Sequence, residues 1–151
     1  MKAIKSGAML AALFASAFMG LASPAPAQQP FPNPLLYLTG IEHYSTAGGN
    51  FVRYRYDVLN KDQYPDALFA AAPHLPPSGT NTNASRTWID FFDGRTRRRL
   101  YGFCALGQAA NLGSIWFATP EGTIPPSYVY IEMTDRQTNT KYRSNLADTV
   151  M

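Results

Sequence analysis

A period of two in the apolar residues runs through most of the chain after residue 34, and it constrains the fold more than any other feature. The alternation is clearest over 51–59, where one face carries Val52, Tyr54, Tyr56 and Val58. Successive side chains alternate between the two faces of a β-strand, whereas a helix requires a period near 3.6. We therefore expect antiparallel strands, each with one face buried and the other exposed.

Seven segments show a strand pattern, and turn residues separate most of them. No helical pattern is long enough for the crossover that parallel strands need. The predicted class is all-β: a single seven-stranded antiparallel β-sandwich of the immunoglobulin-like or fibronectin type III-like kind, with short helical turns in its loops. A small β-barrel is the alternative. The segments are 35–45, 51–59, 87–93, 97–105, 114–119, 128–134 and 141–146.

The β-sandwich domain is expected over 35–147. An extended proline-rich arm over 28–34 precedes it, and a tail over 148–151 that we expect to fray follows it. The dipeptide Asp93-Gly94 predicts a tight hairpin turn, and segment 73–85, rich in Pro, Asn, Ser and Thr, predicts the longest loop. Both tryptophans, Trp88 and Trp116, are expected in the core.

The first 27 residues have the pattern of a signal peptide. Lys2 and Lys5 precede an apolar run over 8–22, and Ala25 and Ala27 give the small-residue pattern that signal peptidase recognises. The run of about 15 residues is shorter than the roughly 20 that span a bilayer. We expect cleavage after Ala27, a periplasmic or secreted location, and no stable membrane insertion afterwards.

Removing this leader makes the protein nearly neutral. The chain has 13 Lys and Arg against 10 Asp and Glu, and the leader holds two of the basic residues and no acidic one. The remaining 11 against 10 leave a net charge near +1, which argues against nucleic acid as a partner. The single cysteine, Cys104, excludes an intramolecular disulfide. We expect it to be buried, and pairing between two molecules is the alternative.

Patterns for catalysis and metal binding are weak in this sequence. The two histidines, His43 and His74, are far apart and match no metal-ligand spacing. No nucleophile motif is present, and Asp90 and Asp93, three residues apart on a predicted strand, point to opposite faces. We therefore expect no enzyme activity, no metal and no cofactor. The alternative is a small hydrolase whose site joins His74, Asp90 and Asp93.

The residues best suited to binding lie in the long loop and in the arginine-rich segment that follows it, since loops on a rigid scaffold often carry binding residues. The candidate binding residues are His74, Asn81, Asn83, Arg97 and Arg99. Together with Arg53 and Arg55, the arginines of this segment offer a site for an anionic partner. The interpretation that we favour is that these arginines are solvated and protect a strand edge from pairing.

Several stretches of the chain resemble an uncharacterised family of small secreted bacterial proteins. They cover most of the chain after the leader and comprise 68–70, 75–79, 83–88, 99–106, 116–118 and 142–146. The resemblance implies the compartment and an immunoglobulin- or fibronectin type III-like β-sandwich, and no activity. The family has cysteine where this chain has Ser78, and the resemblance implies that this cysteine is bridged to the one that matches Cys104. It therefore also implies that Ser78 lies close to Cys104.

Export, a sandwich-like pattern and weak catalytic motifs together predict a non-enzymatic binding or interaction domain of the bacterial envelope or periplasm. The expected partner is another envelope protein or a glycan. A glycan or anion binder that uses surface arginines and tyrosines is the alternative within the same class. The sequence does not determine the oligomeric state.

Overall fold

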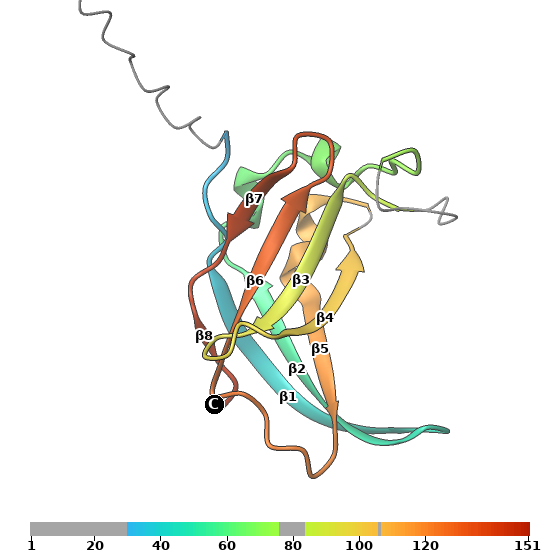
Figure 1. Cartoon of the computed structure of the whole chain (residues 1–151), viewed down its shortest axis with the longest axis vertical. Coiled ribbons are helices and arrows are strands. Elements are labelled where there is room, and N and C mark those ends of the chain that lie inside the picture. Colours follow the sequence, from blue (N-terminus) through green and yellow to red (C-terminus); the bar gives the residue numbers. More distant parts are fainter. Residues whose placement is uncertain (1–29, 76–83, 106) are drawn as a thin grey trace, which may run out of the picture.

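The computed structural model describes residues 30–75, 84–105 and 107–151, and these residues are mostly β (Figure 1). The all-β class predicted from the sequence is confirmed. The strands of the described part are β1 (Leu36–Thr46), β2 (Gly49–Val58), β3 (Thr87–Asp93), β4 (Arg99–Cys104), β5 (Ile115–Pro120), β6 (Tyr128–Asp135), β7 (Thr140–Arg143) and β8 (Ala147–Asp148). Its short 3-10 helices are η1 (Lys61–Gln63), η2 (Asp66–Phe69) and η3 (Ala109–Ser114). Within these residues, no helix has the length and apolar character needed to cross a membrane.

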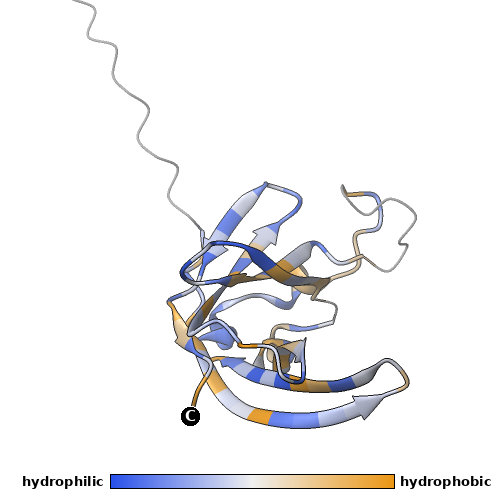
Figure 2. Ribbon diagram, turned by 60° about the horizontal axis from the view of Figure 1, so that its bottom comes forward, coloured by the Kyte–Doolittle hydropathy of each residue, from blue (hydrophilic) through white to orange (hydrophobic). Residues whose placement is uncertain are grey.

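The strands form two antiparallel sheets. One sheet has three strands in the order β1-β2-β5, and the other has five, in the order β4-β3-β6-β7 with β8 also paired to β6. Strands β1 and β2 form a long curved hairpin that extends beyond the rest of the molecule (Figure 2). Near its tip the rings of Tyr44 and Phe51 stack, with their centroids 5.6 Å apart.

Side chains from both sheets meet in one hydrophobic core. Tyr56 of β2 packs on Phe91 of β3 with ring centroids 5.6 Å apart, and Phe91 packs on Phe117 of β5 at 5.3 Å. Buried apolar area stabilises the fold by about 25 cal/mol per Å², so this shared core holds the two sheets together. The buried apolar side chains of β2 agree with the predicted alternation: Tyr54, Tyr56 and Val58. In β6, Val129, Ile131 and Met133 alternate in the same way, and Tyr130 of the opposite face is buried as well, at 5% exposed.

The prediction that both tryptophans lie in the core is wrong. Trp88 and Trp116 are only half-buried. Each lies directly before a fully buried residue of its own strand, Ile89 and Phe117 respectively. Because successive side chains of a strand point to opposite faces, both indole rings lie on the outer faces of their sheets.

One side of the two sheets is closed by the chain that follows β7, and we call strands β1, β7 and β8 the closed side. The side-chain amide of Asn145 accepts a hydrogen bond from the N–H of Leu36 at 2.7 Å and donates one to its C=O at 3.0 Å, as a neighbouring strand would. Strand β8 then pairs with β6, and the buried Thr149 hydroxyl donates to the C=O of Pro126. The strand count is therefore eight in place of seven, and the tail predicted to fray is held as far as Thr149.

The connection between β3 and β4 is longer than the tight turn predicted at Asp93-Gly94. The backbone C=O of Asp93 accepts the N–H of Arg97 at 2.9 Å, and Arg97 has a positive φ of 59°. The Asp93 carboxylate accepts the N–H groups of Thr96 and Arg95, and these bonds, that of Thr96 first, lower its pKa. Asp93 is thus a turn residue, and the loop it stabilises displays several arginines.

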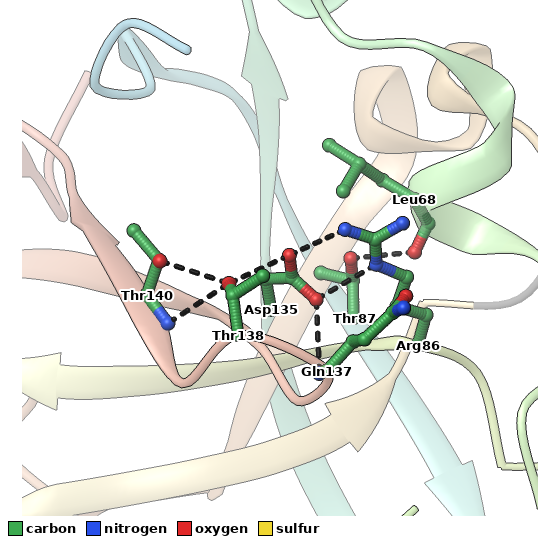
Figure 3. A network of polar contacts seen from close by, with 7 residues as sticks. All are labelled: Leu68, Arg86, Thr87, Asp135, Gln137, Thr138 and Thr140. Atoms are coloured by element: carbon green, nitrogen blue, oxygen red, sulfur yellow. Dashed lines mark hydrogen bonds and ion pairs between the residues drawn. The ribbon is translucent and has the colours of Figure 1, made fainter. Parts of the chain in front are cut away.

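A polar network lies where the segment predicted as the long loop rejoins the sheet (Figure 3). Arg86 donates to both carboxylate oxygens of Asp135, at 2.8 and 2.6 Å. The Thr138 hydroxyl and the N–H of Gln137 donate to the same carboxylate. Burial alone would raise the pKa of Asp135, but Arg86 and these other donors hold it below its ordinary value. The network therefore fixes the start of β3 to the turn between β6 and β7.

The two described ends of the loop segment are joined at its base. The N–H of Ala72 donates to the C=O of Ala84 at 2.7 Å, and the buried Arg136 donates to the C=O of Ser85. The predicted residues Ser78, Asn81 and Asn83 lie outside the described residues. Their roles in binding, and the proximity of Ser78 to Cys104, therefore stay predictions.

Candidate functional site

The candidate site is a groove on the side of the molecule opposite the closed side. Strands β4 and β5 are edge strands of different sheets, and the chain between them contains η3. We call these two strands the open side. The groove between them has a volume of about 290 Å³. In β4 no residue is buried, so this edge of the five-stranded sheet is accessible.

The groove has an apolar floor and a polar rim. Leu112 and Ile115 line it and are only 1% and 4% exposed, and Phe103 packs on the core beside them. The rim contains the exposed side chains of Gln108, Asn111 and Ser114. Ligand sites typically combine a mostly apolar lining with a few polar groups, at volumes from roughly 300 to 1,000 Å³. This groove is at the small end of that range, which suits one or two side chains.

A row of stacked side chains leads from the groove onto the outer face of the three-stranded sheet. Tyr101 stacks with Trp116 at 5.8 Å between centroids and 14° between planes, and with Phe103 at 5.9 Å. The Arg53 guanidinium lies 4.5 Å from the ring centroid of Trp116 and 4.4 Å from that of Tyr44. Strands β4 and β5 are not paired through their backbones, so side-chain stacking connects the sheets on the open side.

Glu42 engages two of the arginines that the sequence assigned to an anion site. Its carboxylate lies 2.7 Å from Arg53 and 2.9 Å from Arg55. The hydrogen bond from Arg55, followed by that from Arg53, lowers the pKa of Glu42. Both arginines lie on the outer face of the three-stranded sheet, whereas Arg99 lies on that of the five-stranded sheet. The alternative hypothesis that Arg53 and Arg55 form one anion site with Arg97 and Arg99 is therefore wrong.

Cys104 lines the groove, and the expectation that it is buried is wrong. Its thiol is free and the residue is half-buried. Cys104 pairs with Trp88 of β3, and among the described residues no strand pairs with the other edge of β4. The side chain therefore stays accessible at the sheet edge. Because Cys104 pairs with Trp88, its side chain lies on the outer face of the sheet, and as the only cysteine of the chain it allows a thiol reagent to modify β4 at a single position.

Gly102 leaves the room in which Arg99 reaches across to Asp90. The Arg99 Nε donates to Asp90 Oδ1 at 2.6 Å, and the Trp88 indole N–H donates to the same oxygen at 2.9 Å. A Cβ at position 102 would overlap both the guanidinium and the carboxylate. Asp90 is thus an ion-pair partner, and the predicted binding residue Arg99 is engaged with it.

The turn between β3 and β4 carries three exposed arginines: Arg95, Arg97 and Arg98. Within the described residues none of the three has an ion-pair partner. Since the turn leads directly into β4, these charges lie at one end of the accessible strand edge. The predicted binding residue Arg97 is one of them.

The structure does not bring all the predicted binding residues together. His74 is exposed and lies beside Arg86, just before β3, whereas Arg97 lies in the turn after β3. At about 3.4 Å per residue, a strand of this length separates its two ends by roughly 20 Å.

The residues of the hydrolase alternative, His74, Asp90 and Asp93, line three separate hollows. In the described ranges, no group of three or more His, Cys, Asp or Glu side chains is placed to hold a metal ion.

Sequence reasoning missed the groove as a unit. The short helical turns predicted in the loops include one at η3, and the strands on either side were predicted near their observed positions. The missing information was which strands are edges. Without it, Tyr101 and Trp116 could not be assigned to one site, because they belong to different sheets.

No protein-family model, curated protein or solved structure matches the chain. The site is therefore assessed on the geometry and chemistry of its own residues.

Proposed function

We propose that the protein is an exported, non-enzymatic binding domain that holds a partner at the groove between β4 and β5. The observation that carries this proposal is an apolar floor that opens to solvent beside a ring, that of Tyr101, which is 41% exposed. Concave apolar surface rimmed by polar groups is typical of binding sites. Asp90, which pairs with Gly102 of β4, is held by Arg99 and Trp88, which favours binding over catalysis.

The architecture and the location belong to the same proposal. Two antiparallel sheets with a common core support a β-sandwich of the immunoglobulin-like or fibronectin type III-like kind. The leader pattern of residues 1–27 and the resemblance to secreted bacterial proteins support a periplasmic or secreted location. We expect the protein isolated from the cell envelope to begin at Gln28. An intact mass of the full chain from that source would contradict cleavage after Ala27.

Another envelope protein is the partner that we favour, because the groove borders an accessible strand edge. A glycan or another anion is the second candidate, and the exposed Arg95, Arg97 and Arg98 favour it. The two candidates differ in how salt changes binding. Salt screens exposed charges, over about 10 Å at 0.1 M, so a glycan or anion held by these arginines should bind more weakly as salt is raised. A partner held mainly by apolar contacts in the groove should depend less on salt.

Crosslinking capture in the native envelope tests the proposed function. The tagged chain is compared with Ser114→Trp, which fills the groove rim, and with Thr123→Trp, an equally exposed site in the loop between β5 and β6. We expect a partner that is captured by the wild type and by Thr123→Trp and is lost with Ser114→Trp. Equal capture by all three proteins would contradict the groove as the binding site.

A further inference from the structure

We infer that the partner binds as an extended peptide that adds a strand to β4 and inserts an apolar side chain into the groove. This inference rests on the proposed function and deepens it by specifying the chemistry of the ligand. In strand addition, main-chain hydrogen bonds supply affinity and pockets for alternate side chains supply specificity. Both features are present on the open side.

The hydrogen-bonding phase of β4 leaves donors and acceptors on its free edge. The N–H of Ala105 donates to the C=O of Thr87 at 3.1 Å, so Ala105 faces β3. Because hydrogen-bonded and non-hydrogen-bonded pairs alternate in an antiparallel ladder, the backbone groups of Cys104 and Gly102 point away from β3. In the described part of the chain, neither residue has a backbone hydrogen bond on that side.

The groove lies where the inward side chains of an added strand would point. Tyr101 and Phe103 pair with the fully buried Phe91 and with Ile89, so all four share the inner face of the sheet. The residue of an added strand that pairs with Phe103 points to the same face. It therefore faces the groove floor at Leu112 and Ile115. A volume of about 290 Å³ accepts one large apolar side chain.

The closed side does not offer the same site. The edge of β1 begins at Leu36, whose N–H and C=O are both bonded to the Asn145 side chain. Strand β8 lies beside β1 there. On the open side no side chain of the described residues occupies the edge of β4 in this way. At the edge of β1 the backbone groups of Leu36 are therefore bonded within the chain, whereas the backbone groups at the edge of β4 are available to a partner strand.

We expect the peptide to run antiparallel to β4, and the charges at one end of β4 specify its flanking residues. All pairings of the five-stranded sheet are antiparallel, and an antiparallel peptide ends beside the start of β4. Arg97 and Arg98 lie at that end, exposed and without an ion-pair partner among the described residues. The peptide should therefore carry Asp, Glu or its own terminal carboxylate about five residues after the apolar anchor, given one residue per paired position.

Selection of random twelve-residue peptides displayed on phage, with the purified protein as bait, identifies the probe. We expect enriched peptides to contain one large apolar residue followed by acidic residues. A synthetic copy of the enriched peptide then binds the wild type and Thr123→Trp alike, and at least tenfold more weakly to Ser114→Trp. Arg98→Gln should weaken binding about threefold to tenfold at low salt, and Arg55→Gln, its matched control on the other sheet, should not.

N-methylation of the same synthetic peptide distinguishes strand addition from other ways of filling the groove. Methyl groups on the backbone nitrogens that face β4 should reduce affinity at least tenfold, and methyl groups on the alternate nitrogens should change it less than threefold. Equal effects of both patterns, or failure to enrich any peptide, would overturn strand addition. If envelope capture still depends on Ser114 in that case, the binding function stands and the ligand is a glycan or a folded surface. If capture is also independent of Ser114, the proposed function fails as well.

Discussion

The closed side and the open side of this protein join the same two sheets by different physical means. On the closed side, the Asn145 amide satisfies both backbone groups of Leu36, and β8 adds a further pairing. On the open side, Tyr101 and Trp116 stack across the gap, and no strand in the described part of the chain pairs with the outer edge of β4. Directional hydrogen bonds complete an edge, whereas stacked rings bridge two sheets and leave the backbone free.

From this difference we infer that stability and binding depend on opposite sides of this small β-protein. A buried donor or acceptor that loses its partner costs about 1–3 kcal/mol, whereas a contact at an exposed edge is worth much less. The closed side should therefore carry stability, and the open side should tolerate change and be available for a partner. The predictions that follow test this comparison in order of decreasing effect.

The largest effect is expected at Arg86, in the network that fixes the β6–β7 turn. Arg86→Gln leaves the Asp135 carboxylate, only 3% exposed, without its cation. Breaking a buried pair costs roughly 3–5 kcal/mol; because a quarter of the Arg86 side chain is exposed, we expect about 2–3 kcal/mol at pH 7. Urea denaturation measures the loss, and a change below about 0.5 kcal/mol would show that the network does not stabilise the fold.

The same pair gives a dependence of stability on pH. The pKa of Asp135 is lowered in the folded protein, so its contribution is fully present above the unfolded value of about 3.9 and is lost as the pH falls below that value. The wild type should therefore lose more stability than Arg86→Gln between pH 5 and pH 2. Parallel curves for the two proteins would contradict the assigned cause of the shift.

Asn145→Ala tests the closed side directly. Removing the amide leaves both backbone groups of Leu36 without a partner, and Leu36 is 4% exposed. We expect a loss of about 2 kcal/mol. Its counterpart on the open side, Gln108→Ala, removes an exposed amide from the groove rim and should cost less than about 0.5 kcal/mol. Equal losses would remove the distinction between the two sides.

Gly102→Ala should have an intermediate effect on the open side. The added methyl overlaps the space in which Arg99 reaches Asp90, and the strand must shift or the ion pair must open. Overpacking of this kind costs about 1–3 kcal/mol, and we expect the lower end because Arg99 is 53% exposed. In the double variant with Arg99→Ala the cost should fall, and thermal unfolding of the four proteins measures this coupling.

The smallest effect on stability is expected from a thiol reagent at Cys104. The residue is half-buried and lines the groove, so a maleimide should give a single adduct with the folded protein and change the unfolding free energy by less than about 0.5 kcal/mol. Intact mass spectrometry follows the reaction. A thiol that reacts only after denaturant is added would show that Cys104 is inaccessible and would contradict β4 as an accessible edge strand.

The sequence allowed the all-β class and most strand positions to be predicted, because alternation over segments such as 51–59 and 128–134 reports which face is buried. It did not reveal which strands lie at edges, because this depends on pairing between distant segments. Trp88 and Trp116 were misassigned for that reason: a large aromatic residue is usually buried, and the direction of a side chain requires the register. Strand β8 was missed because two residues cannot show a period.

The candidate site was less predictable than the fold. Arg97 lies in the turn at one end of β4, but Arg53 and Arg55 are held by Glu42 on the other sheet. The alternation correctly predicted which side chains of β2 share a face. It could not show that Glu42 of the neighbouring strand β1 binds Arg53 and Arg55. Cys104 was expected to be buried from its residue type, and its accessibility follows from the position of β4 as an edge strand.

Hydrogen exchange of the protein alone and in complex with its captured partner tests most directly whether the open side is the binding side. The account predicts that exchange slows in β4 and η3 on binding, while the amides of β1 from Leu36 to Thr46 keep their rates. Slower exchange in β1 with β4 unchanged would contradict it, and the binding surface would then lie on the closed side.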